Sequence, residues 1–139
     1  MGESEATEVA LRALRHRDRS RQDLEERLRL AGIAPEAREE ALDGLAAAGL
    51  LSDDRFAQER ARSLADRNAG DALIRGDLRR HGITDEVISA VLEELDAEHE
   101  RAARVFQRRG GGDRALRYLA GKGFARDSLE SLTTGDPVD

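Results

Sequence analysis

The sequence predicts an all-α protein made of three tandem three-helix units that form an elongated, curved helical array. Two observations carry this prediction. Apolar residues recur at helical spacing along most of the chain, and a glycine followed by an apolar residue closes such a segment three times, at Gly32, Gly82 and Gly123. Charged residues make up 37% of the chain and aromatic residues 3%, which is typical of helices with long polar faces around a small core of Leu and Ala.

The three glycines are expected to mark equivalent helix ends. Glycine adopts the left-handed conformation that closes many helices, and the apolar residue after it can fold back onto the last turn. The residues four and eight positions before each glycine share one apolar helical face: Leu28, Leu78 and Leu119, and Leu24, Ile74 and Ala115. The glycines are 50 and then 41 residues apart, a spacing that indicates tandem helical repeats.

The repeat divides the chain into three units between two tails. We expect an N-terminal tail (residues 1–6), unit 1 (7–52), unit 2 (53–95), unit 3 (96–132) and a disordered C-terminal tail (133–139). The helices of unit 1 are expected near 7–17, 20–31 and 35–48. Ser20 is a favourable N-cap, Pro35 suits a first helical turn, and Gly49 follows the last helix.

The later units follow the same plan. The helices of unit 2 are expected near 53–67, 71–81 and 85–95, with Ser52 or Asp53 capping the first and Thr84 the last. Residues 68–71, Asn-Ala-Gly-Asp, read as a turn. The helices of unit 3 are expected near 97–109, 113–122 and 126–132, and the glycines at 110–112 form a flexible connection.

Charge is distributed unevenly along the chain. The net charge of −6 argues against a general nucleic-acid coat, because affinity that is independent of sequence needs a basic surface. Residues 84–100 hold seven acidic residues and no Lys or Arg, whereas residues 101–126 hold eight basic residues and one acidic residue, Asp113. We therefore predict an electrically striped molecule.

Arginines are the candidate partner-binding residues, because those of the third unit have almost no acidic neighbours in sequence. A solvated charged face is the plain alternative for any one of them. The candidates for contact with an acidic protein surface or with DNA phosphate are Arg12, Arg15, Arg75, Arg79, Arg80, Arg101, Arg104, Arg108, Arg109, Arg114, Arg117, Lys122 and Arg126. If the units stack along one curve, these patches face one elongated groove.

No catalytic or metal-binding constellation is readable. The chain has no cysteine, and its three histidines lack the spacing of a metal site. Asp53 and Asp54 are adjacent, so in a helix they point about 100° apart, and helix capping explains them better than acid–base chemistry. We expect a protein that is not an enzyme, has no cofactor or metal, is cytoplasmic because no leader or membrane-spanning segment is present, and is a monomer.

Several motifs resemble the RecX family. Residues 47–57, AAGLLSDDRFA, are similar to the family's G-L-x-D-D-x-x-F-A junction. Residues 10–24 resemble its A-L-x-L-L … R-x-R-S-x-x-E-L start, with Asp23 where glutamate is usual. Residues 78–83, LRRHGI, and 118–124, YLAGKGF, also fit its pattern. The resemblance covers about residues 7–132 and depends on the order and spacing of several motifs.

The resemblance implies a tandem three-helix protein that binds RecA recombinase filaments on single-stranded DNA, usually in the filament's helical groove. It implies restraint of filament extension, strand exchange, ATP hydrolysis and coprotease activity, with no catalytic residue. The long basic or disordered N-terminal extension of some members is absent here. That departure and the acidic balance reduce the expected direct DNA affinity, which we place as weak at most.

Two alternatives to a RecA regulator stay open. A helix-turn-helix DNA reader is suggested by helices 20–31 and 35–48, but the would-be recognition helix carries Glu36, Glu39, Glu40 and Asp43 against one arginine and would repel phosphates. A repeat scaffold for another partner is the second alternative, and only the family motifs separate it from the RecA regulator.

Overall fold

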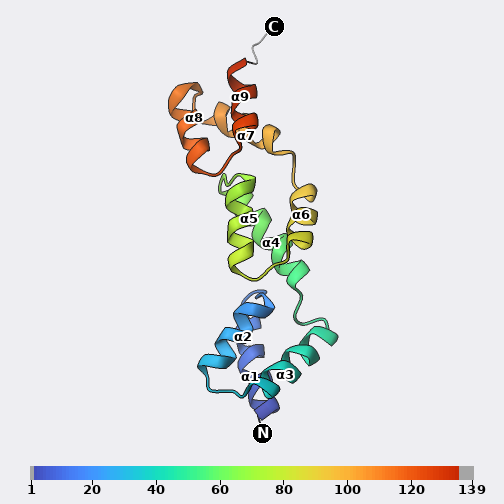
Figure 1. The fold of residues 1–139 in the computed structure, drawn as a ribbon. Coiled ribbons are helices and arrows are strands. Elements are labelled where there is room, and N and C mark those ends of the chain that lie inside the picture. The colour runs from blue at the N-terminus through green and yellow to red at the C-terminus, as the bar shows by residue number, and fades with distance from the viewer. Residues whose placement is uncertain (1, 135–139) are drawn as a thin grey trace.

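The computed structural model describes residues 2–134, and within them the structure is entirely helical (Figure 1). The predicted all-α fold class is therefore confirmed. Each predicted helix is present, and most ends fall within one residue of the expected positions. The helices are α1 (Gly2–Leu14), α2 (Arg21–Leu30), α3 (Pro35–Ala47), α4 (Asp53–Asp66), α5 (Asp71–Arg80), α6 (Asp85–Glu94), α7 (Glu98–Arg108), α8 (Gly112–Gly121) and α9 (Arg126–Thr134).

The helices gather in threes around separate small cores and stack end to end, with α1 and α9 at opposite ends of an elongated array (Figure 1). One core joins α1, α2 and α3, the next α4, α5 and α6, and the last α7, α8 and α9. Each core contains the leucine four residues before its glycine, and these are Leu28, Leu78 and Leu119, all fully buried. The helical repeat read from the sequence is thus present in three dimensions.

The glycine-apolar pairs end α2, α5 and α8 in the same way. The φ angles of Gly32, Gly82 and Gly123 are +82°, +81° and +88°. After each glycine, the apolar residue donates its backbone N–H to the carbonyl of the buried leucine five residues earlier, at 3.1, 3.1 and 3.2 Å. This is the helix closure that the sequence predicts.

Hydroxyl side chains cap the N-termini of α2, α4 and α6. The Oγ of Ser20 accepts from the N–H of Asp23 at 3.1 Å, and the Oγ of Ser52 accepts from Arg55 at 3.1 Å. Thr84 caps α6 in the same manner at 3.3 Å. Of the two predicted caps for α4, Ser52 fills the position, and Asp53 instead accepts the backbone N–H of Arg21 at 2.7 Å. This carboxylate therefore ties the start of α2 to α4.

The expected N-terminal tail is wrong, because residues 2–6 are the first turns of α1. Ala6, Ala10 and Ala13 form a small-residue stripe that is nearly inaccessible and packs in the first core with α3. Small side chains let two helices approach closely, and the glutamates of the first turn sit favourably at a helix N-terminus. The helix also ends at Leu14, earlier than the expected residue 17.

The expected C-terminal tail is wrong at its start, because α9 continues through Thr134. The Oγ1 of Thr133 donates to the carbonyl of Glu130 at 2.9 Å, so this polar residue is accommodated within the last helical turn. Residues 135–139, the rest of the predicted tail, lie outside the described residues.

Side chains make the junction between the first two units. Gln22 Nε2 donates to the carbonyl of Arg80 at 2.8 Å, and Asp23 Oδ2 lies 2.8 Å from His81 Nδ1. Arg55 reaches back to both carboxylate oxygens of Asp18, at 2.9 and 3.0 Å. All of these contacts are partly exposed or exposed.

Backbone and buried side chains make the junction between the second and third units. The N–H of Gly70 donates to the carbonyl of Lys122 at 2.8 Å, and the N–H of Ala72 donates to Gly123 at 3.2 Å. Glu98 spans the same junction, because its carboxylate accepts the backbone N–H of Asp71 at 2.8 Å and the hydroxyl of Ser128 at 2.8 Å. The start of α5 is thereby fixed to unit 3.

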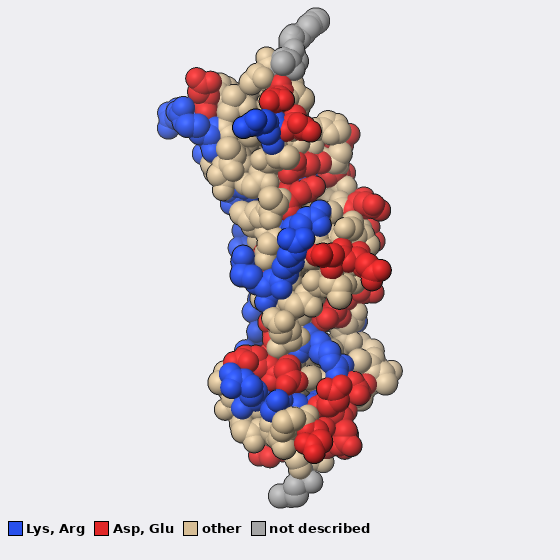
Figure 2. Space-filling view, in the orientation of Figure 1, with Lys and Arg blue, Asp and Glu red and all other residues tan. Residues whose placement is uncertain are grey.

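Opposite charges occupy different sides of the middle unit (Figure 2). In the middle unit, blue basic side chains form a band over α5, whereas red acidic side chains crowd the side of α6 and, in the first unit, the side of α3. The sequence of α6 explains its share, because Asp85, Glu86, Glu93 and Glu94 face no basic residue within that helix. The acidic part of the predicted striping is thus visible at α6 on this face, and the basic stripe over residues 101–126 stays a prediction.

An arginine pocket between α7 and α8

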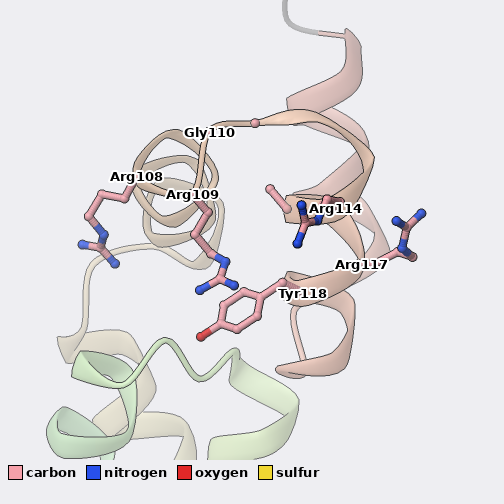
Figure 3. Close-up of a pocket in the computed structure, with 8 residues that line it drawn as sticks. Arg108, Arg109, Gly110, Arg114, Arg117 and Tyr118 are labelled. Atoms are coloured by element: carbon pink, nitrogen blue, oxygen red, sulfur yellow. The ribbon is translucent and has the colours of Figure 1, made fainter.

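The third unit carries a cavity of about 860 Å³ between α7 and α8 (Figure 3). Arginines from the end of α7 and from α8 surround it, together with one tyrosine and the glycine turn. Its lining residues, called here the arginine pocket, are Arg108, Arg109, Gly110, Gly111, Arg114, Ala115, Arg117 and Tyr118. Four of the predicted partner-binding arginines thus meet at one site.

Arg109 and Tyr118 lie against each other in the wall of the pocket (Figure 3). The guanidinium carbon of Arg109 lies 3.5 Å from the centre of the Tyr118 ring, which is a close cation–π stack. Arg114 lies beside this pair, and Arg108 and Arg117 mark its two outer edges. The flat face of one guanidinium is therefore held against an aromatic ring at the centre of the site.

Asn68, at the end of α4, holds the pocket from the neighbouring unit. Its Nδ2 donates to the hydroxyl of Tyr118 at 3.0 Å, and its Oδ1 accepts from Arg108 at 2.9 Å. Asn68 has a φ of +72°, a left-handed conformation that asparagine tolerates better than most residues. A single side chain of unit 2 thus orients two lining residues of unit 3.

Three consecutive glycines make the turn that closes the pocket. Gly110, Gly111 and Gly112 have φ angles of +86°, +68° and +79°, a run that residues with a Cβ would adopt only under strain. The N–H of Gly111 donates to the carbonyl of Phe106 at 2.8 Å and ends α7. The connection predicted to be flexible is therefore a turn with a defined hydrogen bond, and it leaves the pocket mouth without side chains.

The pocket is electrostatically one-sided. No Asp or Glu lines it, and Arg114 and Arg117 are exposed and make no ion pair in the part of the chain described here. Like charges held close together raise the local positive potential and attract anions. Chemically, the arrangement suits an anion that can accept hydrogen bonds from several guanidinium groups.

Arg101 does not fit the expected contact role, because it is buried. Only 7% of the residue is exposed, and its guanidinium donates to Asp71 Oδ1 at 2.9 Å and to the carbonyl of Ala69 at 2.8 Å. Its guanidinium also lies 5.8 Å from the centre of the Phe124 ring. Arg101 therefore holds units 2 and 3 together and has no surface left for a partner.

The remaining arginines of unit 3 are spread around its surface. Arg104 pairs with Asp96 at 2.9 Å, with both side chains exposed. Lys122 is half-buried and Arg126 is exposed, and neither lines the pocket. The structure thus separates these candidates from the four arginines of the pocket.

The candidates of the first two units form smaller groups. Arg79 pairs with Asp85 at 3.0 Å, and Arg80 lies 3.6 Å from Asp77, while Arg75 is half-buried. Arg12 is exposed on the last turn of α1 and Arg15 is exposed just after it, and Arg15 lines a separate hollow of about 400 Å³. A single groove joining these groups to the third unit stays a prediction.

Two residues that matter to the site were missed from the sequence. In the sequence, Tyr118 stands out only as part of a family motif, and Asn68 only as a turn residue. They lie 50 positions apart, so no local pattern links them. The usable signal was the single tyrosine of the chain, placed four residues after an arginine and therefore on the same helical face.

The sequence matches two domain profiles of one family. Residues 6–45 match "RecX, first three-helix domain", and residues 52–92 match "RecX, second three-helix domain". The chain belongs to the RecX family. No helix in the described part of this RecX chain is long and apolar enough to cross a membrane.

Named relatives of this RecX chain support the same assignment. It is 39% identical over 135 residues to the "Regulatory protein RecX" of Chromohalobacter salexigens, covering 89% of each chain. It is 33% identical over 140 residues to that of Stenotrophomonas maltophilia, covering 94% of this chain and 86% of the relative. The fold of RecX from Lactobacillus salivarius aligns with a TM-score of 0.80 at 22% identity, covering 95% of this chain and 94% of that one.

Proposed function

We propose that this RecX chain binds RecA recombinase filaments on single-stranded DNA and inhibits filament extension, strand exchange, ATP hydrolysis and coprotease activity. Its relatives are named regulatory proteins, and the similarity runs along nearly their full length. The proposed regulator acts by contact and not by catalysis, as a cytoplasmic monomer without cofactor. The observation that carries the proposal is the elongated three-unit array of a RecX chain, bearing exposed arginines on every unit.

The array supports contact with a long, repetitive partner. Each unit presents exposed or half-exposed arginines from α1, α5 and α8, and several of them lack an ion pair within the described residues. A surface divided among stacked units can contact successive subunits of a filament, because repeat proteins use such extended faces for binding. We expect the arginines of α1 and α5 to meet acidic side chains of RecA.

The helix-turn-helix alternative gains no support from an observation of the structure. The helix that would enter a major groove in unit 1 is α3, which carries Glu36, Glu39, Glu40 and Asp43. The corresponding helix of unit 2, α6, has four acidic residues and no basic one. Both helices would repel the phosphates that flank a groove.

The test is RecA ATP hydrolysis on single-stranded DNA, titrated with this protein at moderate salt. We expect inhibition at protein concentrations that leave naked DNA unbound, measured in parallel by a DNA-only gel shift. If RecA is unaffected while the protein binds naked DNA tightly, the proposal is overturned in favour of a DNA-binding module.

A further inference from the structure

We propose that the arginine pocket binds a nucleotide unit, with the phosphate at Arg114 and Arg117 and the base beside Arg109 and Tyr118. The inference concerns a ligand taken up by this protein alone and does not depend on the proposed contact with RecA. The shared chemistry is a phosphate attached to a planar base. Its source is either a single strand of nucleic acid or a free nucleotide.

The size and openness of the pocket fit such a ligand. Its volume of about 860 Å³ lies within the range of roughly 300 to 1,000 Å³ that small-molecule sites occupy. Gly110 and Gly111 leave one wall without side chains, and a Cβ added to Gly111 would lie 3.4 Å from the ring of Phe106. The glycine turn thus places only backbone atoms at the mouth of the site.

The charges fit a phosphate. Arg114 and Arg117 are exposed, make no ion pair among the described residues, and follow each other by one helical turn. Guanidinium groups bind phosphate through paired N–H donors, and several of them around one cavity reinforce each other. Among residues 2–134, no carboxylate lines the pocket to compete for these donors.

The stacked pair favours a nucleotide over an acidic peptide. Arg109 stacks on Tyr118, and the hydrogen bond from Asn68 to the Tyr118 hydroxyl holds the far end of the ring in place. Aromatic rings and guanidinium planes are the surfaces on which nucleic-acid bases stack. Carboxylate side chains accept hydrogen bonds from the N–H groups at the edge of a guanidinium. They do not stack on its flat face or on an aromatic ring.

The net negative charge of the rest of the molecule limits the length of nucleic acid that can bind at the site. The net charge is −6, and the carboxylates of α6 would repel a strand that ran along the array. We therefore expect contact with about two or three phosphates. For single strands this number predicts that log K falls with log salt concentration at a slope of roughly −1.4 to −2.1.

The experiment measures anisotropy of fluorescent oligothymidylates of five and twenty nucleotides with the full chain and no RecA. The test variant is R114E/R117E, and the matched control is R27E/R62E, which makes the same charge change at two exposed arginines outside the pocket. We expect at least a tenfold loss of affinity in the first variant and less than a twofold loss in the second. Circular dichroism melting confirms that both variants fold.

A second variant separates stacking from charge. Arg109→Lys keeps the positive charge but loses the flat guanidinium, so we expect it to weaken binding several-fold. A five-residue strand of abasic phosphates should bind more weakly than the thymidylate. Equal binding of the two strands overturns the part of the proposal that concerns the base.

Competition identifies the source of the nucleotide. Displacement of the five-residue strand by free thymidine monophosphate or ATP supports a free nucleotide as ligand, and displacement only by oligonucleotides supports a single strand. Equal displacement by a polyglutamate peptide overturns the proposal and makes the pocket a site for acidic proteins. An equal loss of affinity in R27E/R62E and R114E/R117E also overturns it, because binding would then follow net charge alone.

Discussion

Gly70 and Gly123 meet backbone to backbone at the junction of the second and third units. A Cβ placed on Gly70 would lie 2.5 Å from the carbonyl carbon of Gly123, and a Cβ placed on Gly123 would lie 2.7 Å from the backbone nitrogen of Leu73. Atoms cannot approach so closely, so neither position has room for a side chain unless the units move apart. The glycine that ends α8 therefore also sets the distance between two units.

The first prediction concerns Gly123→Ala. Its φ of +88° and the contact with Leu73 both oppose a methyl group, so we expect the free energy of unfolding to fall by about 3 kcal/mol. Urea denaturation measures the change. Gly44→Ala, in α3 with open space around its Cβ, is the control and should raise stability by about 0.5 to 1 kcal/mol. Equal stability of the two variants would contradict the close junction.

The second prediction tests the repeat through Leu78→Ala. Leu78 is fully buried in the second core, so truncation should lower the free energy of unfolding by about 2 to 5 kcal/mol. Leu28→Ala and Leu119→Ala should fall in the same range because they occupy the same position in their own units. Leu30, with 71% of its surface exposed, is the control, and its truncation should change stability by less than about 0.5 kcal/mol.

The third prediction contrasts two arginines of α7 that lie one turn apart. Arg101→Ala should lower the free energy of unfolding by about 3 kcal/mol, because it leaves the buried carbonyl of Ala69 and the carboxylate of Asp71 without their donor. Arg104→Ala removes only an exposed pair with Asp96 and should change stability by less than about 1 kcal/mol. Thermal melting followed by circular dichroism separates these outcomes, and a small effect of Arg101→Ala would return it to the candidate contacts.

The fourth prediction concerns pH. Arg60 donates twice to the carboxylate of Asp77 at 2.8 Å, and these hydrogen bonds lower the pKa of Asp77 in the folded state. A lowered folded-state pKa contributes stability above the ordinary aspartate pKa of about 4 and loses it as the pH falls through the folded value. Asp77→Asn should therefore lower the free energy of unfolding by about 2 kcal/mol at pH 7.

The same difference should shrink as the pH falls below about 4, because the unfolded chain then takes up a proton at Asp77 that the folded protein takes up only at its lower pKa. Urea denaturation between pH 3 and pH 7 provides the measurement. Asp85→Asn serves as control, because Asp85 and its partner Arg79 are both exposed. A gap between Asp77→Asn and the parent protein that stays constant down to pH 3 would show that the ion pair does not contribute.

The fifth prediction tests the proposed RecA contact at the far end of the array. Arg12 at the end of α1 and Arg15 just after it are exposed, and neither makes an ion pair within residues 2–134. The variant R12E/R15E should inhibit RecA ATP hydrolysis several-fold more weakly, with an unchanged melting temperature. R27E/R62E should inhibit like the parent protein, and full inhibition by R12E/R15E would remove α1 from the proposed interface.

Much of the fold follows from local patterns. Helix closure at Gly32, Gly82 and Gly123 needs only the left-handed freedom of glycine and an apolar residue after it, so both the repeat and the helix ends could be read from the sequence. The helical structure of residues 2–6 could not be read from the sequence, because their acidic composition resembles that of a solvated tail. The burial of Ala6 against the first core stabilises the helix there.

The candidate site was only partly predictable for the same reason. The concentration of arginines after residue 100 is a property of composition and could be counted. Which arginine is buried in the fold depends on partners that are distant in sequence. Arg101 donates hydrogen bonds to Ala69, 32 residues away, and to Asp71, 30 residues away. Asn68 and Tyr118 are likewise brought together only by the junction of two units.

The two junctions give the array unequal stiffness along its length. Units 2 and 3 are joined through backbone hydrogen bonds at Gly70 and Ala72, whose donors cannot rotate away without unwinding α5. Units 1 and 2 are joined in the described residues through the side chains of residues such as Gln22 and Arg55, which can change rotamer and re-form their bonds. When the array bends to follow a curved surface, the hinge lies between the first and second units, and the second and third units move together as one rigid body.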